Sequence, residues 1–216
     1  MSPDELKIKL RQECKERLAN LDFKALITKS AKLSELFFLW TKENAHLFQN
    51  RAIVSFYPFG NEPGLNIELE DKSEPYRISY VRVENWKRGE MEAYYLRRDL
   101  PGIWEEIELK GETKIFQPVP TLPKCASDEI AVVLVPGLAF TRTGDRLGRG
   151  AGFYDRFLAR NPSALRVGVA FEEQILPKLP VDSWDILVDV LLTDSGMFPM
   201  KSYGEWKKHG KLVREG

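Results

Sequence analysis

The sequence predicts an α/β fold: a single domain over residues 1–216, built as a three-layer α/β/α sandwich around a largely parallel central sheet. Apolar strand-like runs alternate with amphipathic helical stretches along the chain, which is typical of this class. One run, Ile130–Val135, is apolar at every position, as expected for a parallel strand that is covered on both faces. The sequence shows no internal repeat, low-complexity tract or clear interdomain linker, so one domain is expected.

The charge balance and the apolar content exclude several classes of protein. The 32 basic and 32 acidic residues cancel, so there is no overall field to hold nucleic acid or an anionic membrane surface. The charged start of the chain lacks the apolar run of a signal peptide, and no apolar stretch approaches the roughly 18 residues that span a bilayer. We therefore expect a soluble cytoplasmic protein, and a monomer is favoured over an oligomer. Cys14 and Cys125 are too far apart in sequence to form a redox or metal motif.

The first elements are expected to be two helices. Apolar residues recur at every fourth position near the start of the chain and form one stripe on a surface helix: Leu6, Leu10, Cys14 and Leu18. Lys7 and Arg11 then share the flank of that stripe. Residues 25–48 carry many large apolar side chains, which predicts a second helix that packs on the core.

Strands follow the two helices. A β-branched and aromatic run at residues 52–57 predicts a strand, and the loop after it contains Glu62. The strands expected at residues 76–83 and 92–96 are polar enough to lie near an edge of the sheet. Residues 97–128 are rich in Pro and Glu and are not assigned to any element.

The second half of the chain continues the alternation. The strand Ile130–Val135 is expected to run directly into a glycine-rich loop, which a helix at residues 153–159 follows. Further strands are predicted at residues 166–170 and 186–192. Because ligands of α/β sheets collect beyond the carboxyl ends of the strands, the glycine-rich loop is the expected ligand site.

The glycine-rich loop has the composition of an anion site. Average usage of about 7% predicts fewer than one glycine in nine residues, but this stretch holds Gly144, Gly148, Gly150 and Gly152. Glycine lets a ligand approach the main chain closely, and Arg146 and Arg149 stand among the glycines. The spacings GxxxxGK[ST] and GxGxxG are absent, so this is neither a P-loop nor a Rossmann loop. A wide structural turn is the alternative, but the two arginines favour a phosphate cradle.

Two aspartates are candidates for a metal site. Asp155 follows the loop at the expected start of a helix, where it either complements the helix dipole or, if the phosphates belong to ATP, helps to hold Mg²⁺. Asp185 could supply a second carboxylate or be a turn residue. The sequence does not decide whether Asp185 or Asp189 faces the metal.

Other polar residues have two interpretations each. Lys7 and Arg11 are four residues apart on one helix, so they either reach a polyphosphate as two cations or lie on a solvated surface. Glu62 either accepts hydrogen bonds from a donor-rich ligand or is simply exposed. Neither His46 nor the second histidine has a sequence partner that suggests a triad or a zinc site, which disfavours hydrolases and metalloproteases.

With these residues assembled, the chain resembles the 5-formyltetrahydrofolate cyclo-ligase family, also called methenyltetrahydrofolate synthetase. The strongest match is PGLAFTRTGDRLGRGAGFYDRFL, which resembles the family pattern PGLAFD..G.RLG.G.G.YDR.L nearly position for position. KIKLR, YPFGNE and FEEQILPKLPVDSWDILVDVLLTD resemble further family blocks in the same order. The resemblance covers about residues 4–194, and the tail from Ser195 stays unassigned.

The resemblance implies an enzyme that converts 5-formyltetrahydrofolate to 5,10-methenyltetrahydrofolate, with ATP as co-substrate, Mg²⁺ as cofactor, and release of ADP and phosphate. In the family's chemistry, the formyl oxygen attacks the γ-phosphate, N10 of the folate captures the resulting iminium phosphate, and phosphate leaves. Such a reaction needs positioning and charge neutralisation rather than a protein nucleophile. The missing Ser, Cys or His constellation is therefore expected.

The resemblance also implies roles for individual residues. ATP is expected to bind at Lys7, Arg11, Arg146, Leu147, Gly148, Arg149, Gly150, Ala151, Gly152, Phe153 and Tyr154. The folate substrate is expected to bind at Tyr57, Glu62, Arg149, Gly150, Ala151, Gly152 and Phe153. Asp155 and Asp185 fall at metal positions, and Arg149 and Asp155 are the expected catalytic residues.

The chain departs from the family pattern at four positions. Thr141 and Gln117 replace an Asp and a Glu, Phe153 replaces a Tyr, and Asp194 is a shortened Glu. Thr141 and Phe153 keep the main chain and the aromatic face. Gln117 loses a charge, so no substrate role is assigned to it.

Two other classes of function compete with this interpretation. A sugar-phosphate isomerase-like or CoA transferase-like enzyme would need a catalytic carboxylate at a strand end and no ATP, and the paired Lys7 and Arg11 argue against it. A non-catalytic folate- or nucleotide-binding protein would keep the loop but could lose the metal carboxylate. Asp155 is present, which makes this the weaker alternative.

Overall fold

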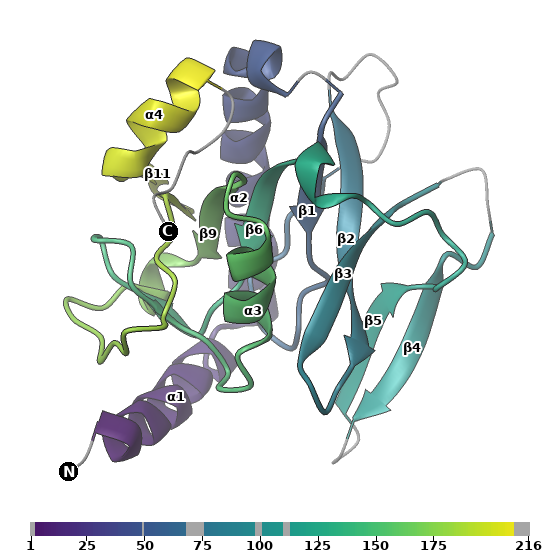
Figure 1. Cartoon of the computed structure of the whole chain (residues 1–216). Helices are drawn as coiled ribbons and strands as arrows, with labels where there is room; N and C mark the ends of the chain where they lie inside the picture. The colour runs from purple at the N-terminus through teal and green to yellow at the C-terminus, as the bar shows by residue number, and fades with distance from the viewer. Residues whose placement is uncertain (1–2, 49, 68–75, 98–100, 110–112, 210–216) are drawn as a thin grey trace.

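A computed structural model describes residues 3–48, 50–67, 76–97, 101–109 and 113–209. The strands of its main sheet are β1 (Ala52–Ser55), β2 (Arg77–Asn85), β3 (Glu90–Tyr95), β6 (Ile130–Val135), β9 (Leu165–Ala170), β10 (Val190–Thr193) and β11 (Gly196–Pro199). Within the described residues these seven strands follow the order β11-β10-β9-β6-β1-β2-β3 (Figure 1). Neighbours from β10 to β2 pair in parallel, and β11 and β3 pair antiparallel at the two edges. The prediction of a largely parallel sheet is confirmed, and β3 lies at an edge as expected.

Helices cover both faces of this sheet. They are α1 (Pro3–Ala19), α2 (Phe23–Glu43), α3 (Phe153–Arg160) and α4 (Lys201–His209), with short 3₁₀ turns η1 (Ala45–Leu47), η2 (Ser127–Glu129) and η3 (Glu172–Gln174). Figure 1 shows α3 in front of the sheet and α2 behind it. The α/β/α layering predicted from the sequence is therefore confirmed.

Strand β6 explains why both faces must be covered. All of its side chains are buried, and successive side chains of a strand point to opposite faces. Val132 and Leu134 join the core cluster that holds residues of α1, α2 and α4. Val133 and Val135 join the other cluster, which includes Phe157 of α3. The continuous apolar run IAVVLV thus serves two cores.

Several boundaries differ from the prediction. The second helix ends at Glu43, and Asn44 caps it: its main-chain amide and its side-chain amide both donate to the carbonyl of Trp40. The strand expected at residues 186–192 is shorter, since β10 begins only at Val190. Asp189, just before it, accepts a hydrogen bond from the amide of Arg166 through its carboxylate. Its own amide donates to the Arg166 carbonyl, so two hydrogen bonds join this segment to the start of β9.

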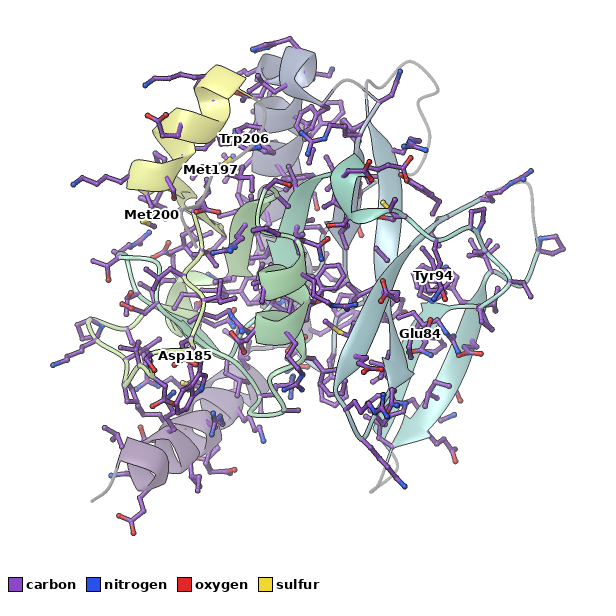
Figure 2. All side chains as sticks on the ribbon, viewed as in Figure 1. Glu84, Tyr94, Asp185, Met197, Met200 and Trp206 are labelled. Atoms are coloured by element: carbon purple, nitrogen blue, oxygen red, sulfur yellow. The ribbon has the colours of Figure 1, made fainter. Side chains whose placement is uncertain are left out.

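Segments left unassigned by the sequence are ordered elements. The stretch rich in Pro and Glu holds the antiparallel hairpin of β4 (Trp104–Leu109) and β5 (Thr113–Pro118). The tail contributes β11 and α4, and Trp206 of α4 is fully buried beside Trp40 and Phe48. Figure 2 shows Trp206 on the inner side of α4. The helices among the described residues are all too short or too polar to cross a membrane.

The connection between β6 and α3 also corrects a prediction. β6 does not run directly into the glycine-rich loop, because a small hairpin of β7 (Ala139–Phe140) and β8 (Arg146–Leu147) comes first. Gly144 lies in the turn of that hairpin with φ of +96°, and a Cβ there would lie 2.8 Å from the carbonyl oxygen of Val188. Residues 148–152 then form the glycine-rich loop proper, and α3 begins at Phe153 as predicted.

Candidate functional site

One cleft of about 1320 Å³ opens beyond the carboxyl ends of β1 and β6. Its walls come from α1, the loop after β1, the β2–β3 and β4–β5 hairpins, the glycine-rich loop with the start of α3, and the loop around residue 184. Every residue that the sequence predicted for the site lines it: Lys7, Arg11, Tyr57, Glu62, Arg146, Leu147, Gly148, Arg149, Gly150, Ala151, Gly152, Phe153, Tyr154, Asp155 and Asp185. The fold thus brings together residues from four separate parts of the chain.

Lys7 is the buried cation at one end of the cleft. It is 6% exposed, and its Nζ lies 2.6 Å from Oδ2 of Asp182 and 2.7 Å from Oδ2 of Asp185. Burial lowers the pKa of Lys7, but the hydrogen bonds to the two carboxylates outweigh it and hold the pKa above its ordinary value. For Asp185, burial acts to raise the pKa, but the hydrogen bonds from Lys7 and from the amide of Asp182 outweigh it. The pKa of Asp185 therefore lies below its ordinary value. Figure 2 shows Asp185 on its loop next to α1.

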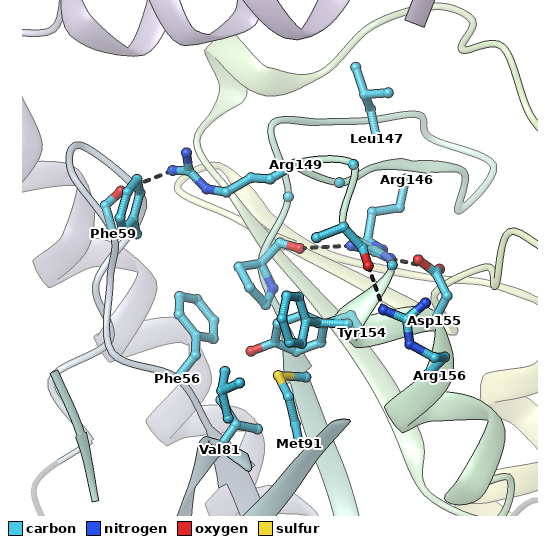
Figure 3. Close-up of a pocket in the computed structure, with 18 of the residues that line it drawn as sticks. Phe56, Phe59, Val81, Met91, Arg146, Leu147, Arg149, Tyr154, Asp155 and Arg156 are labelled. Atoms are coloured by element: carbon cyan, nitrogen blue, oxygen red, sulfur yellow. Dashed lines mark hydrogen bonds and ion pairs between the residues drawn. The ribbon is translucent and has the colours of Figure 1, made fainter. Parts of the chain in front are cut away.

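Arg146 and Asp155 form a second ion pair across the start of α3. Nη2 of Arg146 lies 2.7 Å from Oδ1 of Asp155, and Nη1 donates to the carbonyl of Pro136 (Figure 3). Asp155 is in the first turn of α3, where the sequence placed it. Among the described residues, Nε of Arg146 is buried without a hydrogen-bond partner. A buried, unsatisfied cationic donor in a cleft is suited to an anionic ligand.

A third ion pair joins the glycine-rich loop to the loop after β1. Nε and Nη2 of Arg149 each lie 2.8 Å from Oε1 of Glu62, and Nη2 also donates to the carbonyl of Phe59. Oε2 of Glu62 accepts from the amide of Phe59. Burial raises the pKa of Glu62, against the opposing effect of Arg149 and the Phe59 amide. This carboxylate is therefore buried, and both of its oxygens accept hydrogen bonds from the chain.

Arg11 contacts the main chain of the glycine-rich loop. Nε of Arg11 donates to the carbonyl of Gly148 at 3.0 Å. Gly150 has φ of +104°, and a Cβ on it would lie 3.3 Å from the Arg11 guanidinium. A side chain at this position would be strained and would press on Arg11. The sequence predicted close approach of a ligand to these glycines; in this structure the group next to Gly150 is the guanidinium of Arg11.

The other end of the cleft is apolar. It is lined by Phe56, directly after β1, by Val81 of β2 and by Met91 of β3, and Figure 3 shows them on the side away from Asp155. Tyr57 is half exposed and its ring contacts Trp104 and Phe116 of the β4–β5 hairpin. The cleft therefore combines a charged end with an aromatic end. The Arg149–Glu62 ion pair connects the glycine-rich loop to the loop after β1.

Some cleft residues were missed by the sequence. Asp182 shares Lys7 with Asp185, and only the fold brings it within reach of a lysine in α1. Gln117, from which a role was withheld, lines the cleft with its side chain bonded to Glu105 and to the amide of Val83. Arg156 was not among the predicted site residues, but it lines the cleft and donates to the carbonyls of Ala151 and Gly89. The spacing of Arg156 after the glycines was the signal available for it.

Asp189 does not belong to the cleft. It is 2% exposed, and its carboxylate accepts from the amide of Arg166 and from the hydroxyl of Ser202. Asp185 lines the cleft. Of the two alternatives that the sequence left open, the geometry favours Asp185 as the residue that faces a ligand.

Comparisons with known proteins agree with the motifs. A model of the 5-formyltetrahydrofolate cyclo-ligase family matches residues 89–194. The mouse 5-formyltetrahydrofolate cyclo-ligase is 30% identical over 199 residues, which span 86% of this chain and 93% of the mouse protein. The chain belongs to the 5-formyltetrahydrofolate cyclo-ligase family. The family and the enzyme class predicted from the sequence are thereby confirmed.

Two further relatives extend this result. The cyclo-ligase of Mycolicibacterium smegmatis is 42% identical over 145 residues, covering 66% of this chain and 73% of that protein. The solved structure of Aquifex aeolicus 5,10-methenyltetrahydrofolate synthetase superposes with a TM-score of 0.72 at 27% identity, covering 91% of this chain and 93% of that one. The α/β fold of the family is therefore the fold of this cyclo-ligase.

Proposed function

We propose that this cleft binds ATP at its charged end and 5-formyltetrahydrofolate at its apolar end, and makes 5,10-methenyltetrahydrofolate. The observation that carries the proposal is the lining of the cleft, which gathers every residue predicted for both substrates. Phosphates need cations and free NH groups, and a pterin needs a flat apolar slot with a few polar partners. The cleft supplies both kinds of surface within one volume of about 1320 Å³.

The proposed reaction joins the two substrates without a covalent protein intermediate. The formyl oxygen attacks the γ-phosphorus, an O–P bond forms, and ADP leaves with the electrons of the broken P–O bond. N10 of the folate then attacks the formyl carbon and loses its proton, and the C–O bond breaks to release phosphate. The chain has to orient two substrates and neutralise phosphate charge, which are the main sources of catalysis in phosphoryl transfer.

Each group of residues has a proposed part. Lys7, Arg11 and Arg146 hold the phosphates together with main-chain NH groups of residues 147–154. Glu62 accepts from the donor edge of the pterin, and Tyr57 lies against the folate. Arg149 forms an ion pair with Glu62 in this structure. Its guanidinium is proposed to turn from Glu62, on the pterin side, toward the transferred phosphoryl group.

The carboxylates fit a magnesium site. Mg²⁺ is usually held by one or two carboxylates plus phosphate oxygens and water. Asp155 and Asp185 both line the charged end of the cleft, and no cluster of three or more acidic, cysteine or histidine ligands occurs among the described residues. This donor set is suited to a cation that arrives with ATP. When bound there, Mg²⁺ supplies charge neutralisation on the phosphates.

Location and assembly remain predictions. The expected cytoplasmic location and monomeric state rest on the sequence, and one relative, from Arabidopsis thaliana, is named a mitochondrial cyclo-ligase. Membership of the family argues against the sugar-phosphate isomerase and CoA transferase alternatives. A non-catalytic binder is the alternative that the experiment below addresses.

The test is direct. Purified protein mixed with ATP, Mg²⁺ and 5-formyltetrahydrofolate should develop the near-ultraviolet absorbance of the methenyl product, with one ADP released for each product molecule. Reactions without ATP, and reactions with Arg146→Ala protein, serve as controls. An intact protein that binds both ligands but gives no absorbance change would leave the binder as the correct function.

A further inference from the structure

Tyr154 carries a buried hydroxyl group that the contacts of the cleft leave unused. The residue follows the glycine-rich loop at the start of α3 and lines the cleft. Its hydroxyl oxygen is buried, and among the described residues it has no hydrogen-bond partner. A buried hydroxyl without a partner costs folding free energy, so it is the kind of group that a ligand is expected to satisfy.

The surroundings of the Tyr154 ring divide the cleft in two. The Arg146 guanidinium carbon lies 5.8 Å from the ring centroid on the charged side. The ring also packs against the two core clusters that contain Phe56 and Met91, the residues of the apolar end. Figure 3 shows the hydroxyl directed away from Arg146 and toward Phe56 and Val81. The polar end of the ring thus points to the apolar half of the cleft.

The hydroxyl is a donor in this position. A tyrosine phenol is neutral at physiological pH, so its hydroxyl carries a proton that it can donate. Phe56, Val81 and Met91 offer no acceptor for its proton. A ligand that enters the apolar half must therefore bring the acceptor with it.

We infer that the Tyr154 hydroxyl donates a hydrogen bond to a carbonyl oxygen of the 5-formyltetrahydrofolate head, and that the side chain of Tyr154 determines folate specificity rather than contacting the nucleotide. This rests on the proposed function and revises the nucleotide role that the resemblance implied for Tyr154. The acceptors of ATP are anionic phosphate oxygens, and the cations that suit them lie on the other side of the ring. The acceptors that fit the apolar half are neutral carbonyls on a flat ring system.

The inference predicts an unusual pair of effects for Tyr154→Phe. Because the hydroxyl has no partner in the ligand-free protein, its removal should leave the thermal midpoint of the ligand-free protein unchanged or raise it. The same change should weaken binding of 5-formyltetrahydrofolate by about 3- to 10-fold, the value of one lost hydrogen bond. Affinity for a non-hydrolysable ATP analogue should stay at the wild-type value.

Tyr203→Phe is the matched control. The Tyr203 hydroxyl lies on α4, outside the cleft lining, and accepts from Nε1 of Trp40 at 2.9 Å. Its loss should lower the thermal midpoint and leave the affinity for both ligands unchanged. The two phenylalanine variants should therefore show opposite patterns of stability and folate affinity.

Calorimetric titration of each ligand, combined with thermal unfolding of the ligand-free proteins, measures these effects. Wild-type folate affinity in Tyr154→Phe would overturn the inference, as would a loss confined to the ATP analogue. A thermal midpoint that falls as far as in Tyr203→Phe, with unchanged folate affinity, would also overturn it. These outcomes are separate from failure of the proposed function, which shows as a wild-type protein that forms no methenyl product.

Discussion

Lys7 is a cleft residue that forms ion pairs with two carboxylates, those of Asp182 and Asp185. It lies on the first helix, yet its two partners are carried by a loop more than 170 positions later in the chain. This ion pair differs from a surface pair, because Lys7 is buried and its removal leaves two partly buried carboxylates without their cation. The pair therefore contributes to folding as well as to the proposed phosphate site.

Lys7→Met should lower the free energy of unfolding at neutral pH by about 1–3 kcal/mol. Asp185 has a pKa below its ordinary value in the wild type, so its contribution is present above the unfolded pKa and is lost as the pH falls through the folded value. The difference between wild type and variant should then shrink below about pH 4. Urea unfolding across the acid range measures this, and a difference that stays constant with pH would contradict it.

The control is Lys9→Met. Lys9 lies on the same helix, but its side chain is 64% exposed and 3.7 Å from Glu13. Exposed pairs of this kind contribute little, so its unfolding curve should follow the wild type at every pH.

Asp155→Asn separates the two roles left open for this carboxylate. If Asp155 holds Mg²⁺, turnover should fall by about 100-fold or more, the Mg²⁺ concentration for half-maximal rate should rise, and folate binding should persist. Steady-state rates over a magnesium series measure this. Asp145→Asn is a suitable control, because that carboxylate bonds Thr141 and Thr143 outside the cleft lining. Wild-type magnesium dependence in Asp155→Asn would leave the residue with only its ion pair to Arg146.

At the scale of elements, the β7–β8 hairpin links the glycine-rich loop to the segment before β10. The amide of Val188 donates to the carbonyl of Gly144, and the Gly144 amide donates to Thr141. The turn therefore positions Arg146 and, through residues 186–188, the loop that carries Asp185.

Gly144→Ala should destabilise the protein more than Gly60→Ala. Both glycines have positive φ, so both substitutions carry a conformational cost of about 1 kcal/mol or more. Only Gly144 adds a steric conflict, because its Cβ would lie 2.8 Å from a main-chain oxygen, whereas nothing lies within 4 Å at Gly60. Chemical unfolding of the two variants measures the difference. Equal losses would show that the hairpin turn relaxes freely around the added methyl group.

At the scale of the whole molecule, the C-terminal elements complete the core on one face. Trp206 is fully buried and stacks with Trp40 and Tyr203, while its neighbour Phe48 follows the second helix. This aromatic group joins the end of the described chain to its first third. The tail that has no match to the family motifs is therefore part of the fold.

Trp206→Ala should lower the free energy of unfolding by about 3–5 kcal/mol, the usual loss for a large buried aromatic residue. Trp184→Ala is the matched control, since that ring is 71% exposed and lines the cleft. It should leave stability nearly unchanged. Chemical unfolding of both variants gives the comparison, and a small loss for Trp206 would mean that α4 packs only weakly on the sheet.

How far the sequence predicts this molecule depends on whether a signal is local. The strand Ile130–Val135 and the start of α3 were predicted correctly, because a continuous apolar run and a glycine-to-helix transition are local patterns. The β4–β5 hairpin was not, since its cross-strand pairs have no signal in a segment rich in Glu and Pro. Asp182 was missed because its partner is far away in sequence, and Gln117 was set aside because charge was the only criterion applied to it.

The three ion pairs of the cleft occupy the cations to which the proposed function assigns the phosphates. Lys7, Arg146 and Arg149 already hold Asp185, Asp155 and Glu62 in the ligand-free protein. Under the proposed function, incoming phosphates must displace carboxylates of the same chain, which act as intramolecular competitors at high effective concentration. The apparent dissociation constant for ATP is then larger than the intrinsic one by the strength of these pairs. Nucleotide, Mg²⁺ and folate should consequently bind more tightly together than singly, because each one takes a member of a pair that the others need released.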